Sequence, residues 1–209
     1  MGFIGVQPAI VPLTSSDITD GIISTAKIAN DAVDNTKLDL TDNYAFTGTI
    51  SGAGKILQIL QNTSTNTDAI SSGATSTIVT QAITPSSSSN KILIFVSINI
   101  GGDNNSYGYG QIKRGTTVIG AGATSSSRPL VSFGIMSALN ANFDYRMGNH
   151  NFTFLDSPST TSETTYKCDV TCTVPTLRTN KTTQDGNNTL GIRGMSTMTL
   201  FEVVAWQIF

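Results

Sequence analysis

The sequence predicts an all-β fold, and three observations lead to this class. Hydrophobic residues make up 38% of the chain and charged residues only 12%, against about 25% charged residues in ordinary soluble domains. Serine and threonine fill the difference at about a quarter of all residues, and threonine, valine and isoleucine favour strands. Short apolar runs are separated by glycine, asparagine, aspartate and serine, which favour turns. We therefore expect a β-sandwich, jelly-roll-like head behind a short N-terminal repeat.

Residues 55–209 are expected to form this head. Alternation is clearest in Thr164–Val174, where Tyr166, Cys168, Val170, Cys172 and Val174 share one face. The apolar run Lys91–Ile100 predicts a central strand. Apolar residues on both faces of the last strand predict cover on both sides, by the core and by a neighbouring subunit. The other expected strands are Lys55–Gln61, Thr77–Thr84, Tyr107–Arg114, Thr116–Ile119, Asn142–Met147, Asn151–Leu155 and Ser196–Trp206.

The two cysteines, Cys168 and Cys172, are predicted to be core residues without a disulfide. Four residues of strand separate them by about 13 Å, which is too far for a bridge within one chain. Two cysteines and one remote histidine also make a poor zinc site.

The segment 13–40 contains an internal repeat. Residues 20–28 align with residues 30–38 at an offset of ten, and a large aliphatic residue recurs every five positions, at Leu13, Ile18, Ile23, Ile28, Val33 and Leu38. Such a stretch cannot bury its stripe alone, so we expect it to face other copies, most simply as a homotrimeric stalk. A β-rich repeat with brief helical turns is favoured over a coiled coil. In a coiled coil, three of the core positions would hold residues that contribute little hydrophobic burial.

Two further N-terminal segments flank this repeat. Residues 1–12 are a proline-containing leader, either a frayed terminus or a particle-docking segment that would use Phe3, Ile4, Gln7 and Pro8. Residues 41–54 are a glycine-rich junction to the head.

Several blocks of the chain resemble tail-fibre proteins of marine bacteriophages. The stalk repeats of those proteins resemble Asp17–Ile28, and the segment after them resembles Leu40–Gly48. Three further blocks look like parts of the accompanying head domain: Ile83–Leu93, Lys113–Ile119 and Phe154–Thr161. The order of the blocks carries the resemblance, which spans residues 13 to the end.

The resemblance implies a trimeric virion fibre on the surface of a phage particle, assembled in the host cytoplasm. Its N-terminus would attach to a tail or capsid protein, and its head would bind a host cell-surface glycan or protein. The repeat is short, with two clear decads, and this keeps open a capsid decoration or head fibre without an essential receptor.

Residues suited to catalysis or cofactor binding are sparse. The only histidine, His150, stands in a turn-like stretch and is expected to be a surface loop residue. No nucleophile motif accompanies it, so we expect no enzyme, no cofactor and no metal site. A net charge of −2 without a basic cluster argues against nucleic-acid binding. The longest apolar run is Ile92–Val96, too short for membrane insertion.

The candidate receptor-binding residues lie in a polar turn with flanking aromatics: Asp103, Asn104, Asn105, Tyr107 and Tyr109. Aromatics beside polar turns suit stacking on sugars, although ordinary cross-strand pairing is the favoured interpretation of the tyrosines. Thr182–Thr189 is a second polar loop that could contribute. Its Asp185–Asn188 stretch and Asp103–Asn105 are oxygen-rich, but they lack the spacing of a calcium loop and are expected to be plain turns.

The aliphatic repeat predicts trimerisation of the full chain. Light scattering at micromolar concentration should give the mass of three subunits. Replacing Ile23 and Ile28 with aspartate should loosen the assembly, because burying unpaired charges costs several kcal/mol. A monomeric parent chain, or a variant trimer of undiminished stability, would contradict the assignment of these residues to the trimer axis.

Overall fold

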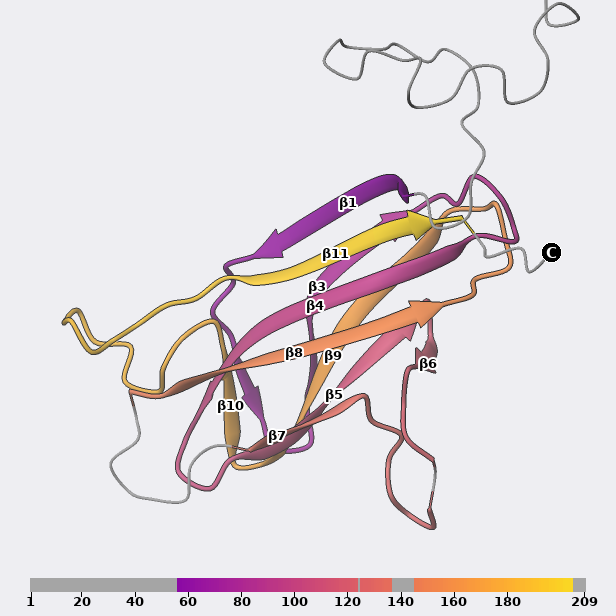
Figure 1. Cartoon of the computed structure of the whole chain (residues 1–209). Coiled ribbons are helices and arrows are strands. Elements are labelled where there is room, and N and C mark those ends of the chain that lie inside the picture. Colours follow the sequence, from indigo (N-terminus) through magenta and orange to yellow (C-terminus); the bar gives the residue numbers. More distant parts are fainter. Residues whose placement is uncertain (1–55, 124, 137–144, 205–209) are drawn as a thin grey trace, which may run out of the picture. The chain divides into compact units, whose positions relative to one another are not determined.

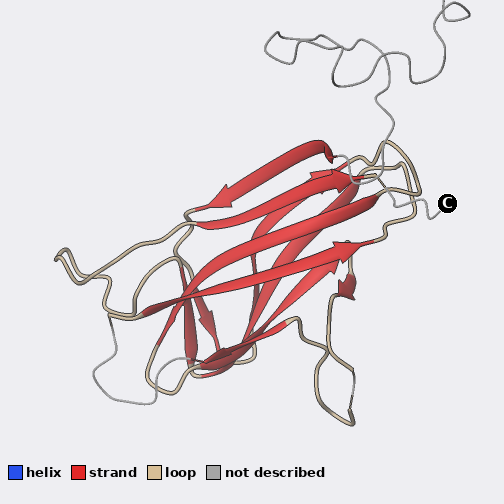
Figure 2. Cartoon of the chain, viewed as in Figure 1, coloured by secondary structure: helices blue, strands red, loops and turns tan. Residues whose placement is uncertain are grey.

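The structure, a computed structural model, describes residues 56–123, 125–136 and 145–204, and within these ranges the chain forms eleven strands and no helix (Figures 1 and 2). The residues proposed for docking and for the stalk, and the boundaries of the segments 1–12, 13–40 and 41–54, lie outside this part. The strands are β1 (Ile56–Ser64), β2 (Ala69–Ser71), β3 (Thr75–Ile83), β4 (Lys91–Gly102), β5 (Tyr107–Arg114), β6 (Thr117–Ile119), β7 (Phe133–Met136), β8 (Met147–Asp156), β9 (Thr164–Val174), β10 (Thr176–Thr179) and β11 (Ser196–Val203).

The strands form two antiparallel sheets. In the first sheet, β11 pairs with β1 and β4, and β8 pairs with the other side of β4. The short strands β10 and β2 extend this sheet beside the end of β4. In the second sheet, β9 lies between β3 and β5, and both β6 and β7 pair with β5.

The order of pairing is that of a jelly roll. Leaving out the short strands β2 and β10, the first strand pairs with the last, β1 with β11, and the second with the second to last, β3 with β9. Inside this nest, β4 pairs with β8, and β5 pairs with β6 and β7. A jelly roll has eight strands in two Greek keys. Successive pairs of this pattern belong alternately to the first and to the second sheet, as they do here. The all-β class and the jelly-roll head predicted from the sequence are confirmed.

The core lies between the two sheets and follows from side-chain alternation. The inward residues of β4 are all aliphatic and at most 4% exposed: Ile92, Ile94, Val96, Ile98 and Ile100. Across from them, β9 contributes Tyr166, Cys168, Val170 and Cys172, all fully buried. Burying one such side chain stabilises the fold by about 1.5–3 kcal/mol. Both cysteines are free thiols in this core, as predicted, whereas Val174 is 44% exposed where the strand ends.

The sandwich has two distinct ends. At the entry end, Ile56 pairs with Val203, so the chain enters β1 beside the point where β11 leaves (Figure 1). The connections 84–90, 115–116 and 157–163 lie at this end. The opposite, distal end collects the segments 65–68, 103–106 and 175–195, because these join the far ends of β1, β4 and β9.

Long alternating strands were predicted well, and of the short strands only β6 was predicted, as Thr116–Ile119. The bounds of β5 and β9 match the expected Tyr107–Arg114 and Thr164–Val174. The strand expected over Asn142–Met147 is wrong for Tyr145 and Arg146, which lie before β8 and belong to no strand. Three strands of three or four residues each, β2, β7 and β10, were not predicted.

A buried carboxylate fixes the entry end. Glu202 on β11 is fully buried between the sheets. Its Oε1 accepts hydrogen bonds from the Ser86 amide at 2.7 Å, the Ser86 hydroxyl at 2.8 Å and Asn90 Nδ2 at 2.6 Å, and its Oε2 accepts one from Gln58 Nε2 at 2.6 Å. Burial favours the protonated form, but the hydrogen bonds outweigh it and lower the pKa of Glu202. This side chain therefore ties the β3–β4 connection and β1 to β11.

Glu202→Gln should destabilise the fold by about 1–3 kcal/mol at neutral pH. The amide group of glutamine would face hydrogen-bond donors that now bind a carboxylate oxygen, and these donors would lose their acceptor. The lowered pKa makes the ionised form stabilising above the ordinary pKa of glutamate, and this stabilisation is lost as the pH falls through the folded-state value. Urea unfolding of both proteins, from neutral pH downward, should show the difference in unfolding free energy closing in acid. A difference that stays constant until the parent unfolds would contradict this role.

Candidate functional site at the distal end

The turn predicted to bind a receptor lies at the distal end, between β4 and β5. Arg178 NH2 on β10 donates to Asp103 Oδ1 at 3.1 Å, and the buried Ser106 hydroxyl donates to the Thr176 carbonyl at 2.6 Å. Between these anchors, Asn104 and Asn105 are exposed, and Asn105 has a φ of 59°, which asparagine tolerates better than most residues. The turn is thus an exposed polar tip held on a rigid base.

The two candidate tyrosines lie two residues apart on the same outer face of the second sheet. Tyr107 begins β5, is 37% exposed and pairs with Met136 and Val174 at the distal rim. Tyr109 lies two residues further along β5, opposite Thr171 on the outer face of the second sheet. The structure therefore places Asp103, Asn104, Asn105 and Tyr107 at the distal rim, and Tyr109 follows them on the outer face of the second sheet.

The second polar loop lies at the same end. Arg193 binds Asp185 through Nε at 2.9 Å and NH2 at 2.8 Å, and Lys181 Nζ lies 3.6 Å from Asp185. The Arg193 guanidinium lowers the pKa of Asp185. Because Asp103 and Asp185 are each paired with an arginine, the two oxygen-rich turns are organised by ion pairs. Within the described residues, no group of three His, Cys, Asp or Glu side chains could hold a metal ion.

A buried asparagine that sequence reasoning missed ties the distal segments together. Asn180 is fully buried with a φ of 52°. Its Nδ2 donates to the carbonyls of Ser64 and Asn66, each at 3.0 Å, and its Oδ1 accepts from the Ser196 hydroxyl at 2.6 Å. One side chain, directly after β10, thus connects the end of β1, the segment that follows it and the start of β11. An asparagine among threonines and lysine in a polar loop gives no sequence signal of burial.

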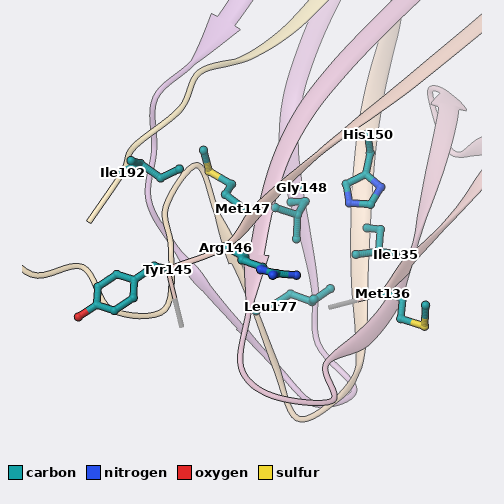
Figure 3. A pocket seen from close by; sticks show the side chains of 12 residues that line it. Ile135, Met136, Tyr145, Arg146, Met147, Gly148, His150, Leu177 and Ile192 are labelled. Carbon is teal, nitrogen blue, oxygen red and sulfur yellow. The ribbon is translucent and has the colours of Figure 1, made fainter. Parts of the chain in front are cut away.

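A cavity of about 420 Å³ opens at the distal end beside β7 and β8 (Figure 3). Aliphatic side chains and methionine line much of it, and Tyr145, Arg146 and His150 add polar and aromatic groups. The lining residues are Ile100, Gly101, Gly102, Ile135, Met136, Tyr145, Arg146, Met147, Gly148, His150, Leu177 and Ile192. They come from four strands and two connections, so this site could not be assembled from any one stretch of sequence.

His150 was predicted to be a surface loop residue, and this is wrong. It lies within β8, paired with Ile98, and its side chain lines the cavity. The imidazole stacks on Phe133 with ring centroids 6.1 Å apart and planes 19° apart. Phe133 in turn lies over Gly110, where a β-carbon would clash with its ring. Burial favours the neutral imidazole and lowers the pKa of His150.

Exposed apolar side chains surround the distal loops. Tyr107, Met136 and Tyr145 are 37%, 63% and 38% exposed. The long connection before β11 adds Leu190, Ile192 and Met195, each between 46% and 57% exposed. A cavity with aromatic and aliphatic walls and a few polar groups suits a small ligand that combines an apolar face with hydrogen-bonding groups.

Comparison with known proteins does not assign the chain to a family. No protein-family model matches the chain, and no curated protein is significantly similar to it in sequence. Among solved structures, the chain aligns with one of infectious bursal disease virus, Gx strain, at 15% identity and a TM-score of 0.37, covering 71% of this chain and 37% of that one. It aligns with the T13 particle of the same virus at 13% identity and a TM-score of 0.40, covering 78% and 40%.

The chain therefore spans less than half the length of the viral chains it aligns with. Scores this low carry no argument about shared function. None of the described residues forms a helix long and apolar enough to cross a membrane.

His150 gives a direct test of the cavity environment, because it is the only histidine in the chain. Its imidazole proton signals should titrate in NMR with a midpoint below the ordinary histidine pKa, since burial disfavours the charged ring. Folding stability should correspondingly fall as the pH drops through the unfolded-state pKa, because the unfolded chain then binds more protons. His150→Gln assigns the signal and should remove this part of the pH dependence. A midpoint at or above the ordinary value would contradict burial against Phe133.

Proposed function

We propose that this protein is a non-enzymatic phage virion protein, a homotrimeric fibre that attaches to the particle by its N-terminal segment and binds a host cell-surface glycan with its distal end. The resemblance of its sequence blocks to tail-fibre proteins supports the virion role. The jelly roll is compatible with that role, but it is a fold shared by proteins of many functions.

One structural observation carries the binding proposal. The chain enters the sandwich at Ile56, whereas both candidate loops and the cavity lie at the opposite end. If the N-terminal segment attaches to a particle, the distal loops are those free to reach a cell. Loops on a rigid scaffold are common binding sites, and Asp103–Arg178 and Asn180 hold these loops in place.

The chemistry of the distal end favours a glycan. Tyr107 and Tyr145 offer partly exposed aromatic rings that can stack on sugar faces. The exposed amides of Asn104 and Asn105 can bond hydroxyl groups. His150, the one imidazole of the chain, is stacked against Phe133, and no nucleophile motif is evident in the sequence. We therefore propose binding without turnover, and three copies would combine weak sites through avidity.

Adsorption assays with variants of the full chain test this function. Particles carrying Tyr107→Ala and Asn104→Ala together should adsorb to host cells about tenfold more slowly, a loss equivalent to about 1.4 kcal/mol. Glu163→Ala is a matched control, because Glu163 is exposed in the 157–163 connection at the entry end. Electron microscopy with an antibody against the chain should first locate it on the particle.

The same assays decide between receptor binding and decoration. If the distal variant is incorporated into particles and adsorbs as well as Glu163→Ala, the distal turn is not the receptor site and a decoration role is favoured. Titrating the chain with host polysaccharide while following the His150 NMR signal separates binding in the cavity, which shifts that signal, from binding to the outer loops. Release of shorter sugars during incubation would contradict the absence of catalysis.

A further inference from the structure

The outer faces of the two sheets differ in chemistry. The face of β3, β9 and β5 is polar: Lys113 Nζ lies 2.8 Å from Asp169 Oδ2, Lys167 Nζ lies 3.5 Å from it, and the Thr77 hydroxyl donates to Asp169 Oδ1 at 2.6 Å. Threonines occupy many of the neighbouring outward positions. Charged and hydroxyl groups of this kind are typical of a solvent-exposed surface.

The outer face of the first sheet carries a continuous apolar row instead. Register places Ile59 beside Phe201, Phe201 beside Leu93 and Leu93 beside Leu155, across β1, β11, β4 and β8. Phe95 adds a ring edge-on to Phe201, with centroids 5.4 Å apart. We call these five residues the apolar belt. Ile59, Phe95 and Leu155 are 56%, 42% and 49% exposed in the single chain.

Charged residues are also nearly absent from this face. Among the outward side chains of β4, β8 and β11, only Lys91 is charged, and its Nζ donates to the Ser157 hydroxyl at 2.7 Å. The outward positions outside the belt are otherwise uncharged: threonine, serine, asparagine, Gly101, Met147 and Val203. Soluble monomers seldom expose a contiguous apolar patch of this kind, and a lack of charge together with aromatic enrichment is typical of the centre of a protein–protein interface.

We infer that the apolar belt packs against another copy of this same chain. The belt crosses the sheet near the entry end, where Ile56 pairs with Val203 and residues 1–55 join the sandwich. Those residues contain the aliphatic ladder that predicts association of three chains. If three chains associate through those residues, their sandwiches become neighbours, and the belt is an apolar surface that each copy can bury against another. Closed homo-oligomers bury the same patch on every copy.

This inference extends the self-association in the proposed function and does not depend on receptor binding. It adds that the head itself contributes to assembly. A trimer held by the repeat alone would leave the belt accessible, so the two ideas can fail separately.

Selective cysteine labelling of the full chain tests the inference. The native thiols Cys168 and Cys172 are fully buried, and burial raises their pKa values, so they react slowly. Leu155→Cys and Ile59→Cys place a new thiol at either edge of the belt. Thr173→Cys is the control, because Thr173 is exposed at the end of β9 in the other sheet. The unfolded variants should all react at equal rates.

The expected result is that the two belt thiols react about tenfold more slowly than the control, a protection of about 1.4 kcal/mol, and that a short bifunctional thiol reagent joins belt variants between chains. Light scattering of the same samples reports the oligomeric state independently. Belt thiols that react as fast as the control overturn the inference, and a trimeric mass in that case leaves self-association through the repeat intact.

Protection without crosslinks between chains would also overturn it, since a segment of the same chain would then cover the belt. Deleting residues 205–209 distinguishes that case: if the deletion releases the belt thiols, the C-terminal residues are the cover. Protection and crosslinking that both survive the deletion support packing against a second copy.

Discussion

The burial of β4, paired along both edges and covered on its inner face, is the constraint on which the rest of the sandwich depends. Its inward isoleucines and valine meet β9 across the core, while β8 and β11 occupy both of its edges. A shift of one residue in this strand would turn five aliphatic side chains to the outside. The register of β8 and β11 is therefore fixed by β4, and through β11 so is the position of β1.

Buried polar side chains then define the two ends, which burial of apolar residues alone would leave loose. Glu202 gathers the connections at the entry end, and Asp156 accepts hydrogen bonds from Tyr166 at 2.7 Å and from Arg114 at 2.8 Å on the same side of the molecule. Asn180 does the same work at the distal end. Each of these groups is costly to bury unpaired, so each imposes one arrangement on the segments it joins.

Much of this fold could be predicted from the sequence, because the period of two along β5 and β9 is a local pattern. The missed strands, such as Phe133–Met136, are too short for a pattern and exist because β5 offers an open edge at Gly110. His150 was misplaced for a related reason. The turn-like residues around it favour a loop, but pairing with Ile98 and its neighbours in β4 overrides that local preference.

The candidate site divides in the same way. The exposed turn at Asp103–Asn105 could be found from composition, since polar and turn-forming residues are adjacent in the chain. The cavity could not, because Ile100, His150 and Ile192 meet only through the jelly-roll connectivity. Tyr109 follows Tyr107 on the same face of β5 and lies further from the distal rim, because alternate residues of a strand share a face.

The separation of the two ends bears on how this chain could vary or be engineered. Ile56 and Val203 are neighbours, so the distal connections contribute nothing to joining the sandwich to its N-terminal segment. Lengthening a surface loop costs little, with each doubling of its length adding about 0.6 kcal/mol of closure entropy. Foreign peptides inserted at the exposed tip of the connection between β10 and β11 would therefore be carried on an unchanged scaffold. The chain is suited to grafting, because diversity can accumulate at one end while the other end stays constant.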